Sequence, residues 1–177
     1  MSFKVPFRKT IFCLLLAVAV GVCFTPFLAL AGVDDFTSDL TITTDLDENT
    51  GKRFNGDNLT FEINSGISYN RQGNNALQFD GARSGATIII NTGATLSTFQ
   101  TGVSRNNAIN AEDAVNLTIT NSGTISVDGG SNAIRLTATS GTQTTNNAGG
   151  KIFSKSAAIN GNSATTIATI SNSGQIY

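Results

Sequence analysis

The sequence of 177 residues contains no histidine and no tryptophan, and it has two cysteines and two prolines. Without histidine, the chain cannot form a Ser-His-Asp triad or a metal site with imidazole ligands. Both cysteines, Cys13 and Cys23, lie in the N-terminal apolar stretch, so the rest of the chain has neither a disulfide framework nor a cysteine metal site. The fold must therefore depend on packing and hydrogen bonds alone.

The first 31 residues have the parts of a secretory signal peptide. Its basic residues are Lys4, Arg8 and Lys9. An apolar stretch follows from residue 11 to 24, and Ala29-Leu30-Ala31 is a small-x-small cleavage site before Gly32. An uncleaved membrane anchor is the alternative, but Thr25-Pro26 interrupts the run before it reaches the roughly 20 residues that span a bilayer. We predict cleavage between Ala31 and Gly32 and export through the Sec pathway.

The chain that remains after cleavage is acidic and polar. Three of the 11 Lys and Arg residues lie in the signal, so the remaining chain has 8 basic and 12 acidic residues and a net charge of −4. This balance argues against a nucleic-acid partner. Thr, Ser, Asn and Gly predominate, which favours strands joined by polar turns. Regularly spaced Ile, Leu and Val argue against the alternative of a disordered chain.

Two short phrases recur along this chain. Around the turn Asn121-Ser122-Gly123, apolar residues alternate with Thr or Ser, a period-two pattern that is typical of half-buried strands. The repeated Asn and Gly positions are Asn64, Gly66, Asn91, Gly93, Asn121, Gly123, Asn147, Gly149, Asn172 and Gly174. A second phrase lies between these copies, centred on Ala76, Ala108, Ala133 and Ala158. Two interleaved phrases at one spacing, roughly 25 to 30 residues, indicate a solenoid.

We therefore predict an all-β fold: a parallel β-helix of about five turns at 59–177, after a helical signal peptide at 1–31 and a cap or linker at 32–58. Stacked turns would place like side chains over like at about 4.8 Å. The five repeated Asn residues are expected to form one ladder. A series of hairpins or a small sandwich is the alternative. The segment 142–147 is entirely polar, so a strand there is poorly supported.

The repeats resemble those of bacterial autotransporter passenger domains. Residues 117–125 read Leu-Thr-Ile-Thr-Asn-Ser-Gly-Thr-Ile, and 170–176 read Ile-Ser-Asn-Ser-Gly-Gln-Ile. The resemblance covers 59–177 and the signal. It implies a right-handed β-helix exported to the cell surface, the extracellular space or the outer membrane of a Gram-negative bacterium. Family members end in a translocator β-barrel that this sequence does not supply. We therefore expect an N-terminal fragment whose missing partner is that barrel, and whose open solenoid ends self-associate.

Few residues suggest chemistry. The segment from Asp45 to Gly51 begins like a calcium loop, but its glycine comes one place late and Gly56 stands where the closing Glu belongs. A solvated acidic loop is the preferred interpretation. Charged residues of adjacent repeats that could share one face are Arg105, Asp113, Asp128 and Arg135. The sequence assigns no catalytic, cofactor-binding or metal-binding residue, and no cofactor is expected.

Two functional hypotheses follow. The first is a non-catalytic, exported surface scaffold of adhesin type, which binds a host or surface glycan or protein through the long faces of the solenoid. The alternative is a β-helix carbohydrate-active enzyme, either a polysaccharide lyase or a hydrolase. That alternative requires acidic side chains gathered in one groove.

Overall fold

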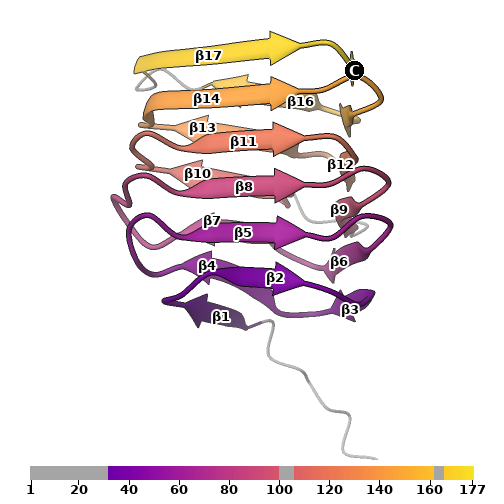
Figure 1. Cartoon of the computed structure of the whole chain (residues 1–177), viewed down its shortest axis with the longest axis horizontal. Coiled ribbons are helices and arrows are strands. Elements are labelled where there is room, and N and C mark those ends of the chain that lie inside the picture. The colour runs from indigo at the N-terminus through magenta and orange to yellow at the C-terminus, as the bar shows by residue number, and fades with distance from the viewer. Residues whose placement is uncertain (1–31, 100–105, 162–165) are drawn as a thin grey trace, which may run out of the picture.

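A computed structural model describes residues 32–99, 106–161 and 166–177. The prediction of cleavage after Ala31 falls on residues outside these ranges. The described chain is a parallel β-helix in which each turn adds one strand to each of three six-stranded sheets (Figure 1). The strands at the front of Figure 1 run from left to right while the chain climbs, so the coil is right-handed. Because β16 lies five turns along the coil from β1, the predicted solenoid of about five turns is confirmed.

The strands follow one another in the order sheet A, sheet B, sheet C. Sheet A contains β1 (Val33–Phe36), β4 (Gly51–Phe54), β7 (Leu77–Phe79), β10 (Ile109–Glu112), β13 (Asn132–Thr137) and β16 (Ala157–Gly161). Sheet B contains β2 (Leu40–Ile42), β5 (Thr60–Ile63), β8 (Thr87–Ile90), β11 (Thr118–Asn121), β14 (Ser140–Asn146) and β17 (Thr166–Asn172). Sheet C contains β3 (Leu46–Glu48), β6 (Ser68–Gln72), β9 (Thr95–Phe99), β12 (Thr124–Asp128), β15 (Lys151–Ser154) and β18 (Gln175–Ile176).

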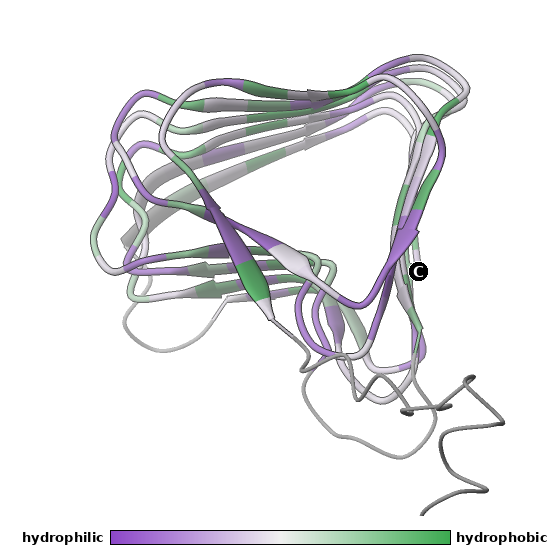
Figure 2. Ribbon diagram, turned by 90° about the horizontal axis from the view of Figure 1, so that it is seen from below, coloured by the Kyte–Doolittle hydropathy of each residue, from purple (hydrophilic) through white to green (hydrophobic). Residues whose placement is uncertain are grey.

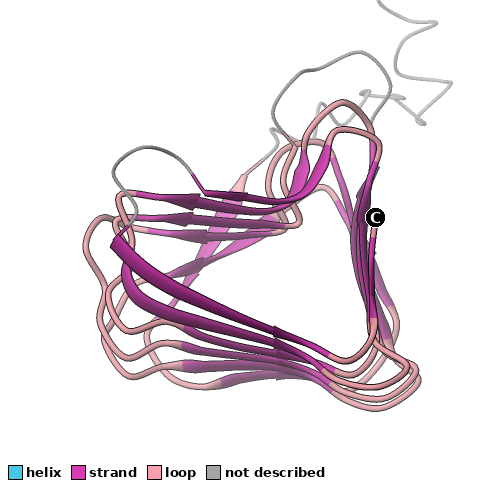
Figure 3. Ribbon diagram, turned by 90° about the horizontal axis from the view of Figure 1, so that it is seen from above, coloured by secondary structure: helices cyan, strands magenta, loops and turns pink. Residues whose placement is uncertain are grey.

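The hairpin alternative is wrong. Strands β11 and β12, on the two sides of the Asn121 turn, belong to different sheets. Each pairs in parallel with strands of the turns below and above, β11 with β8 and β14, and β12 with β9 and β15. Seen along the axis, the sheets form three sides of a triangle and the loops lie at its corners (Figure 3). Across the described ranges, no helix is long and apolar enough to cross a membrane.

The coil begins earlier than the sequence pattern indicates. The segment 32–58, expected to be a cap or linker, contains β1 to β4. Its strands pair in register with later turns: Phe36 lies beside Phe54, and Leu40 beside Phe61. The segment has one Asn-x-Gly sequence, Asn49-Thr50-Gly51, but it lies between β3 and β4, not at the corner between sheets B and C where the later copies lie. Its inward apolar residues include Leu40 and Ile42 of β2 and Phe54 of β4. Apolar residues at inward positions, rather than a copy of the phrase at that corner, therefore mark the start of the coil.

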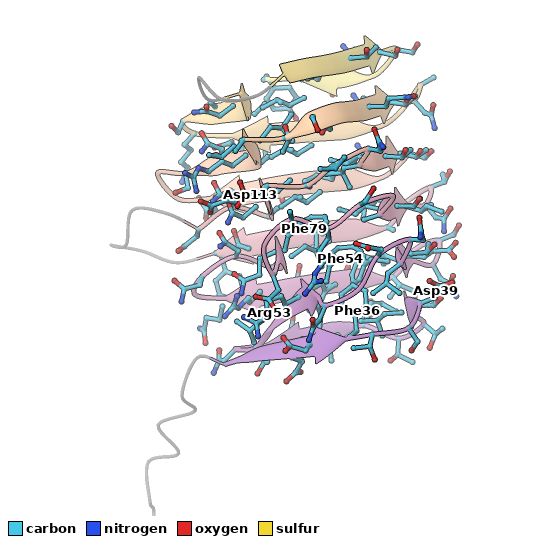
Figure 4. All side chains as sticks on the ribbon, turned by 90° about the vertical axis from the view of Figure 1, so that its left-hand side faces the viewer. Phe36, Asp39, Arg53, Phe54, Phe79 and Asp113 are labelled. Carbon is cyan, nitrogen blue, oxygen red and sulfur yellow. The ribbon has the colours of Figure 1, made fainter. Side chains whose placement is uncertain are left out.

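Inward side chains stack in columns along the axis. Hydrophobic and hydrophilic residues follow one another along the chain (Figure 2). In sheet A, the rings of Phe36, Phe54 and Phe79 form one such column, with centroids 4.5 Å apart at each step (Figure 4). In sheet C, Tyr69, Leu96, Ile125 and Ile152 form another, and all four are fully buried. These columns provide the hydrophobic stabilisation that one turn alone could not.

Strand β14 forms despite its polar sequence. Its inward residues, Thr142 and Thr144, are each 1% exposed, and Thr144 lies between Ile119 and Ile170 in the neighbouring turns. Threonine is β-branched and fits a strand as valine does. The hydroxyls of Thr142 and Thr144 have no hydrogen-bond partner. The neighbouring turns therefore impose the strand, and two buried polar groups remain unsatisfied.

The single ladder expected from the five Asn residues is wrong. The inner corner column is Ile63, Ile90, Asn121, Asn146 and Asn172. The ladder runs through the last three: Asn121 Nδ2 donates to Asn146 Oδ1 at 2.8 Å, and Asn146 Nδ2 donates to Asn172 Oδ1 at 2.8 Å. Asn64, Asn91 and Asn147 each follow an inward residue and lie one place further along the corner.

The cause of this shift is that the corners have two lengths. Four residues lie between Ile90 and Thr95, whereas only two lie between their register partners Asn121 and Thr124. In the long corners, Gly66, Gly93 and Gly149 have φ of 74°, 73° and 85°, and a hydrogen bond from Ile67 N to Asn64 O closes the first of these turns. In the short corners, Gly123 and Gly174 lie against backbone carbonyls of the turn below, so a Cβ has no room. The same phrase thus performs two different structural roles.

The second repeated phrase forms an Asn ladder that the sequence analysis missed. Asn107 Nδ2 donates to Asn75 Oδ1 at 3.0 Å, and Asn132 Nδ2 donates to Asn107 Oδ1 at 3.2 Å. The ladder lies at the corner between sheets C and A. In the next turn Ala157 is the register partner of Asn132, and Asn160 instead donates to Asn132 Oδ1 at 3.3 Å.

Candidate functional site

Sheet B presents a regular polar face on the outside of the coil. Thr60, Thr87 and Thr118 occupy one outward column and are register partners in successive turns. A second outward column includes Thr120, Thr145 and Ser171. Neighbouring strands are about 4.8 Å apart, and alternate residues of a strand are about 6.6 Å apart. Threonine and serine therefore occupy several adjacent positions of this face, and Glu62, Ile89 and Gln143 interrupt the two columns.

Sheet A carries a charged network on its outside. Arg53 donates to both oxygens of Asp35, at 2.6 and 2.9 Å, and lies 3.7 Å from Asp80. Arg83 lies 3.5 Å from Asp80 and donates to Asn55 at 2.9 Å. The hydrogen bond from Arg53 lowers the pKa of Asp35, and the same bond raises the pKa of Arg53. These charged groups pair with one another across successive turns, so the network joins the turns on the outside of the coil.

Acidic residues of the first turns accept hydrogen bonds from the turn above. Asp39, Asp45 and Asp57 accept the backbone amides of Thr60, Ser68 and Ser84 at 2.8, 2.8 and 2.9 Å. The predicted acidic loop is therefore wrong: the segment from Asp45 to Gly51 contains β3 and begins β4. Its carboxylates do not converge as calcium ligands must. Over the described ranges, no group of three or more acidic, His or Cys side chains could hold a metal ion.

A buried polar cluster lies inside the coil near its first turn. Arg71 points inward and is fully buried. Its guanidinium donates to the carbonyl oxygens of Asn75, Gly32 and Asn49. Burial lowers the pKa of Arg71. Because the three carbonyls belong to three successive passages of the same corner, Arg71 joins the first turns from within.

Two more residues complete this cluster. The hydroxyl of Tyr69 donates to Thr50 O at 3.0 Å, and burial, aided by the charge of Glu48, raises its pKa. Lys52 Nζ lies 2.8 Å from Glu48 and 2.8 Å from Asp34. Burial lowers the pKa of Lys52, but the hydrogen bonds to these two carboxylates outweigh it and raise the pKa overall.

The charged residues that the sequence suggested for one face do not come together. Asp113 follows β10 at the corner between sheets A and B, with φ of 58° (Figure 4). Asp128 ends β12 of sheet C and pairs with Lys155. Arg135 lies on β13 and pairs with Glu112 at 3.8 Å. Arg105 lies outside the described residues. The two aspartates therefore sit at opposite ends of the sheet A strands.

A cleft opens on the outside of sheet C, where the chain turns towards sheet A. Its volume is about 310 Å³, and its lining residues are Asp47, Glu48, Asn49, Asn70, Gln72 and Phe99. Asn70 is fixed in place because its amide donates to Asp47 at 2.7 Å and accepts from Ser97 at 2.6 Å. Gln72 and Phe99 are register partners on β6 and β9. The cleft combines carboxylates, amides and one phenyl ring.

Sequence reasoning did not find this cleft, because its residues come from three turns and belong to no repeated phrase. The available signal was the period-two pattern of β6 and β9, which puts Gln72 and Phe99 on the outside beside Asn70 and Ser97. Comparisons of the chain with protein-family models, curated proteins and solved structures found no match.

Proposed function

We propose that the protein is an exported, non-catalytic scaffold of adhesin type that holds a glycan or protein ligand on a lateral face of its β-helix. The observation that carries the proposal is the regularity of the outer columns. Residues such as Thr60, Thr87 and Thr118 repeat at the strand spacing and present hydroxyls without reactive groups. An extended partner meets a threonine at the same position of three successive turns, which suits adhesion to a repetitive surface.

The placement of the acidic residues favours this proposal over a polysaccharide lyase or hydrolase. Hydrolases need two carboxyl groups about 5 to 10 Å apart across the scissile bond, with one of them free to act as an acid. Asp39, Asp45 and Asp57 accept backbone amides, and Asp35 is held by Arg53. In the cleft, Glu48 pairs with Lys52.

The test uses the full chain, expressed with its own leader and recovered from the exported fraction. Labelled protein is applied to a glycan array and to cultured cells, while the same glycans in solution are assayed for new reducing ends and unsaturated products. We expect retention without release of either product. Catalytic release of sugar from any of them contradicts the scaffold and supports the enzyme.

Export itself is tested by N-terminal sequencing of the recovered protein. The Ala29-Leu30-Ala31 site leads us to expect a first residue of Gly32. Recovered protein that still begins at Met1 contradicts the signal-peptide prediction. Light scattering on the same material measures the expected self-association, and a monomer at every concentration argues against it.

A further inference from the structure

The cleft on sheet C has the dimensions and lining of a small-ligand site. Its volume of about 310 Å³ lies at the lower end of the usual range for such sites, roughly 300 to 1,000 Å³. It lies over β3, β6 and β9, so three turns of a rigid coil fix its walls. Sites on regular elements hold their side chains more precisely than sites on loops.

One wall of the cleft is an exposed phenyl ring. Phe99 is 43% exposed, whereas Phe54 and Phe61 are fully buried in the core. An exposed aromatic ring buries a large apolar area when a partner covers it. The ring is flanked by Gln72, its register partner in the turn below. A ligand for this wall therefore needs one apolar face with polar groups at its edge.

The remaining walls offer hydrogen bonds. Within the described chain, the side-chain amides of Asn49 and Gln72 make no hydrogen bond. Asp47 accepts from Asn70 through Oδ1, and its Oδ2 makes no hydrogen bond to any other described residue. Each amide can both donate and accept, and a carboxylate accepts only. Hydroxyl groups, which do both, satisfy all three residues. Negatively charged ligands would face Asp47 with no unpaired cation among the lining residues.

We propose that this cleft binds one uncharged sugar ring of a glycan. The C–H face of the ring packs on Phe99, and its hydroxyls bind Asn49, Gln72 and Asp47. Phe99 and Gln72 set the specificity, because Phe99 recognises the apolar C–H face of a pyranose and Gln72 recognises its hydroxyl groups. This assignment rests on the proposed adhesive function and names its ligand class.

The absence of tryptophan provides a direct test. Phe99→Trp keeps an aromatic wall and introduces a single tryptophan at the cleft. Phe153→Trp is the matched control on the same sheet, where the native ring lies 5.5 Å from that of Tyr177, away from the cleft. The probes are cellotetraose and chitotetraose, with tetragalacturonate as the anionic comparison. We expect a saturable fluorescence change at position 99 with at least one neutral probe, and none at position 153.

Loss of the contacts gives the second readout. Phe99→Ala and Gln72→Ala are each expected to weaken binding of the responding neutral probe at least tenfold, with an unchanged melting temperature. Having two variants keeps the test decisive if one of them fails to fold. An equal response at positions 99 and 153, or a stronger response to tetragalacturonate, overturns the assignment.

The outcome also separates this inference from the proposed function. If the exported protein adheres to cells or to an array but shows no change at position 99, the cleft assignment fails and the scaffold stands. If the protein neither adheres nor responds, both fail. If it responds at position 99 and releases sugar products, the cleft stands and the non-catalytic function fails.

Discussion

The side-chain amide of Asn121 donates to that of Asn146, 2.8 Å away in the next turn. Asn121 also accepts the backbone amide of Gly123 at 3.2 Å and donates to Lys151 O at 3.1 Å. Because the Asn121 side chain is fully buried, water cannot replace the hydrogen bonds that it makes to these partners. One residue thus satisfies polar groups of its own short corner and of strands β14 and β15 in the next turn.

Replacing Asn121 by leucine should leave these backbone groups unpaired and cost about 1–3 kcal/mol of stability. Asn147→Leu is the control, since Asn147 lies outside the ladder and donates to Ser122 Oγ. We expect that control to change stability by less than about 0.5 kcal/mol, as is usual at the surface. Urea melts measure both. An equal loss of stability in the two variants would show that the ladder hydrogen bonds of Asn121 contribute no more than a surface contact.

Removing a buried hydroxyl should stabilise the protein. Thr144→Val keeps the shape of the side chain between Ile119 and Ile170 and deletes an oxygen without a partner. The expected gain is about 1 kcal/mol. Thr145→Val, on the outward side of the same strand, should be neutral. A loss of stability in Thr144→Val would indicate that the hydroxyl finds a partner in solution.

The two kinds of corner glycine should respond differently to substitution. Gly66 has φ of 74° and open space around it, so Gly66→Ala should cost about 1–2 kcal/mol and Gly66→Asn less. A Cβ at Gly123 would collide with the carbonyl oxygen of Ala94, so Gly123→Ala should cost about 3 kcal/mol or more. Asparagine should not rescue position 123. Thermal melts of the four variants compare them, and rescue at both positions would contradict the two-corner description.

High pH should destabilise the coil through Tyr69. Burial raises the pKa of this hydroxyl above the ordinary value of 10.0, so its contribution is complete below pH 10.0 and is lost as pH rises beyond it. The raised pKa of Lys52 acts in the same direction above 10.5. The expected slope from Tyr69 is about 1.4 kcal/mol per pH unit. Urea melts at several alkaline pH values should show a smaller slope in Tyr69→Phe, and an unchanged slope would contradict this role.

The parallel coil could be predicted because most turns repeat period-two apolar runs, as in Leu117, Ile119, Ile125 and Val127. The register of the Asn residues could not, because corners of different length use the same phrase, and sequence spacing does not reveal which Asn faces inward. The polar strand β14 was missed for a related reason: stacking on Ile119 decides its conformation. The cleft depends on Asp47, Gln72 and Phe99, which the coil alone brings together.

Arg71 also dictates an order of events during folding. Its guanidinium binds carbonyls of Gly32, Asn49 and Asn75, so it cannot complete these bonds until residue 75 is in place. A chain that emerges N-terminus first can join its first two turns through Arg53 and Asp35, but the Arg71 cluster stays incomplete until residue 75 is in place. We therefore expect a chain that ends before residue 75 to lack one of the three carbonyl partners of the buried Arg71.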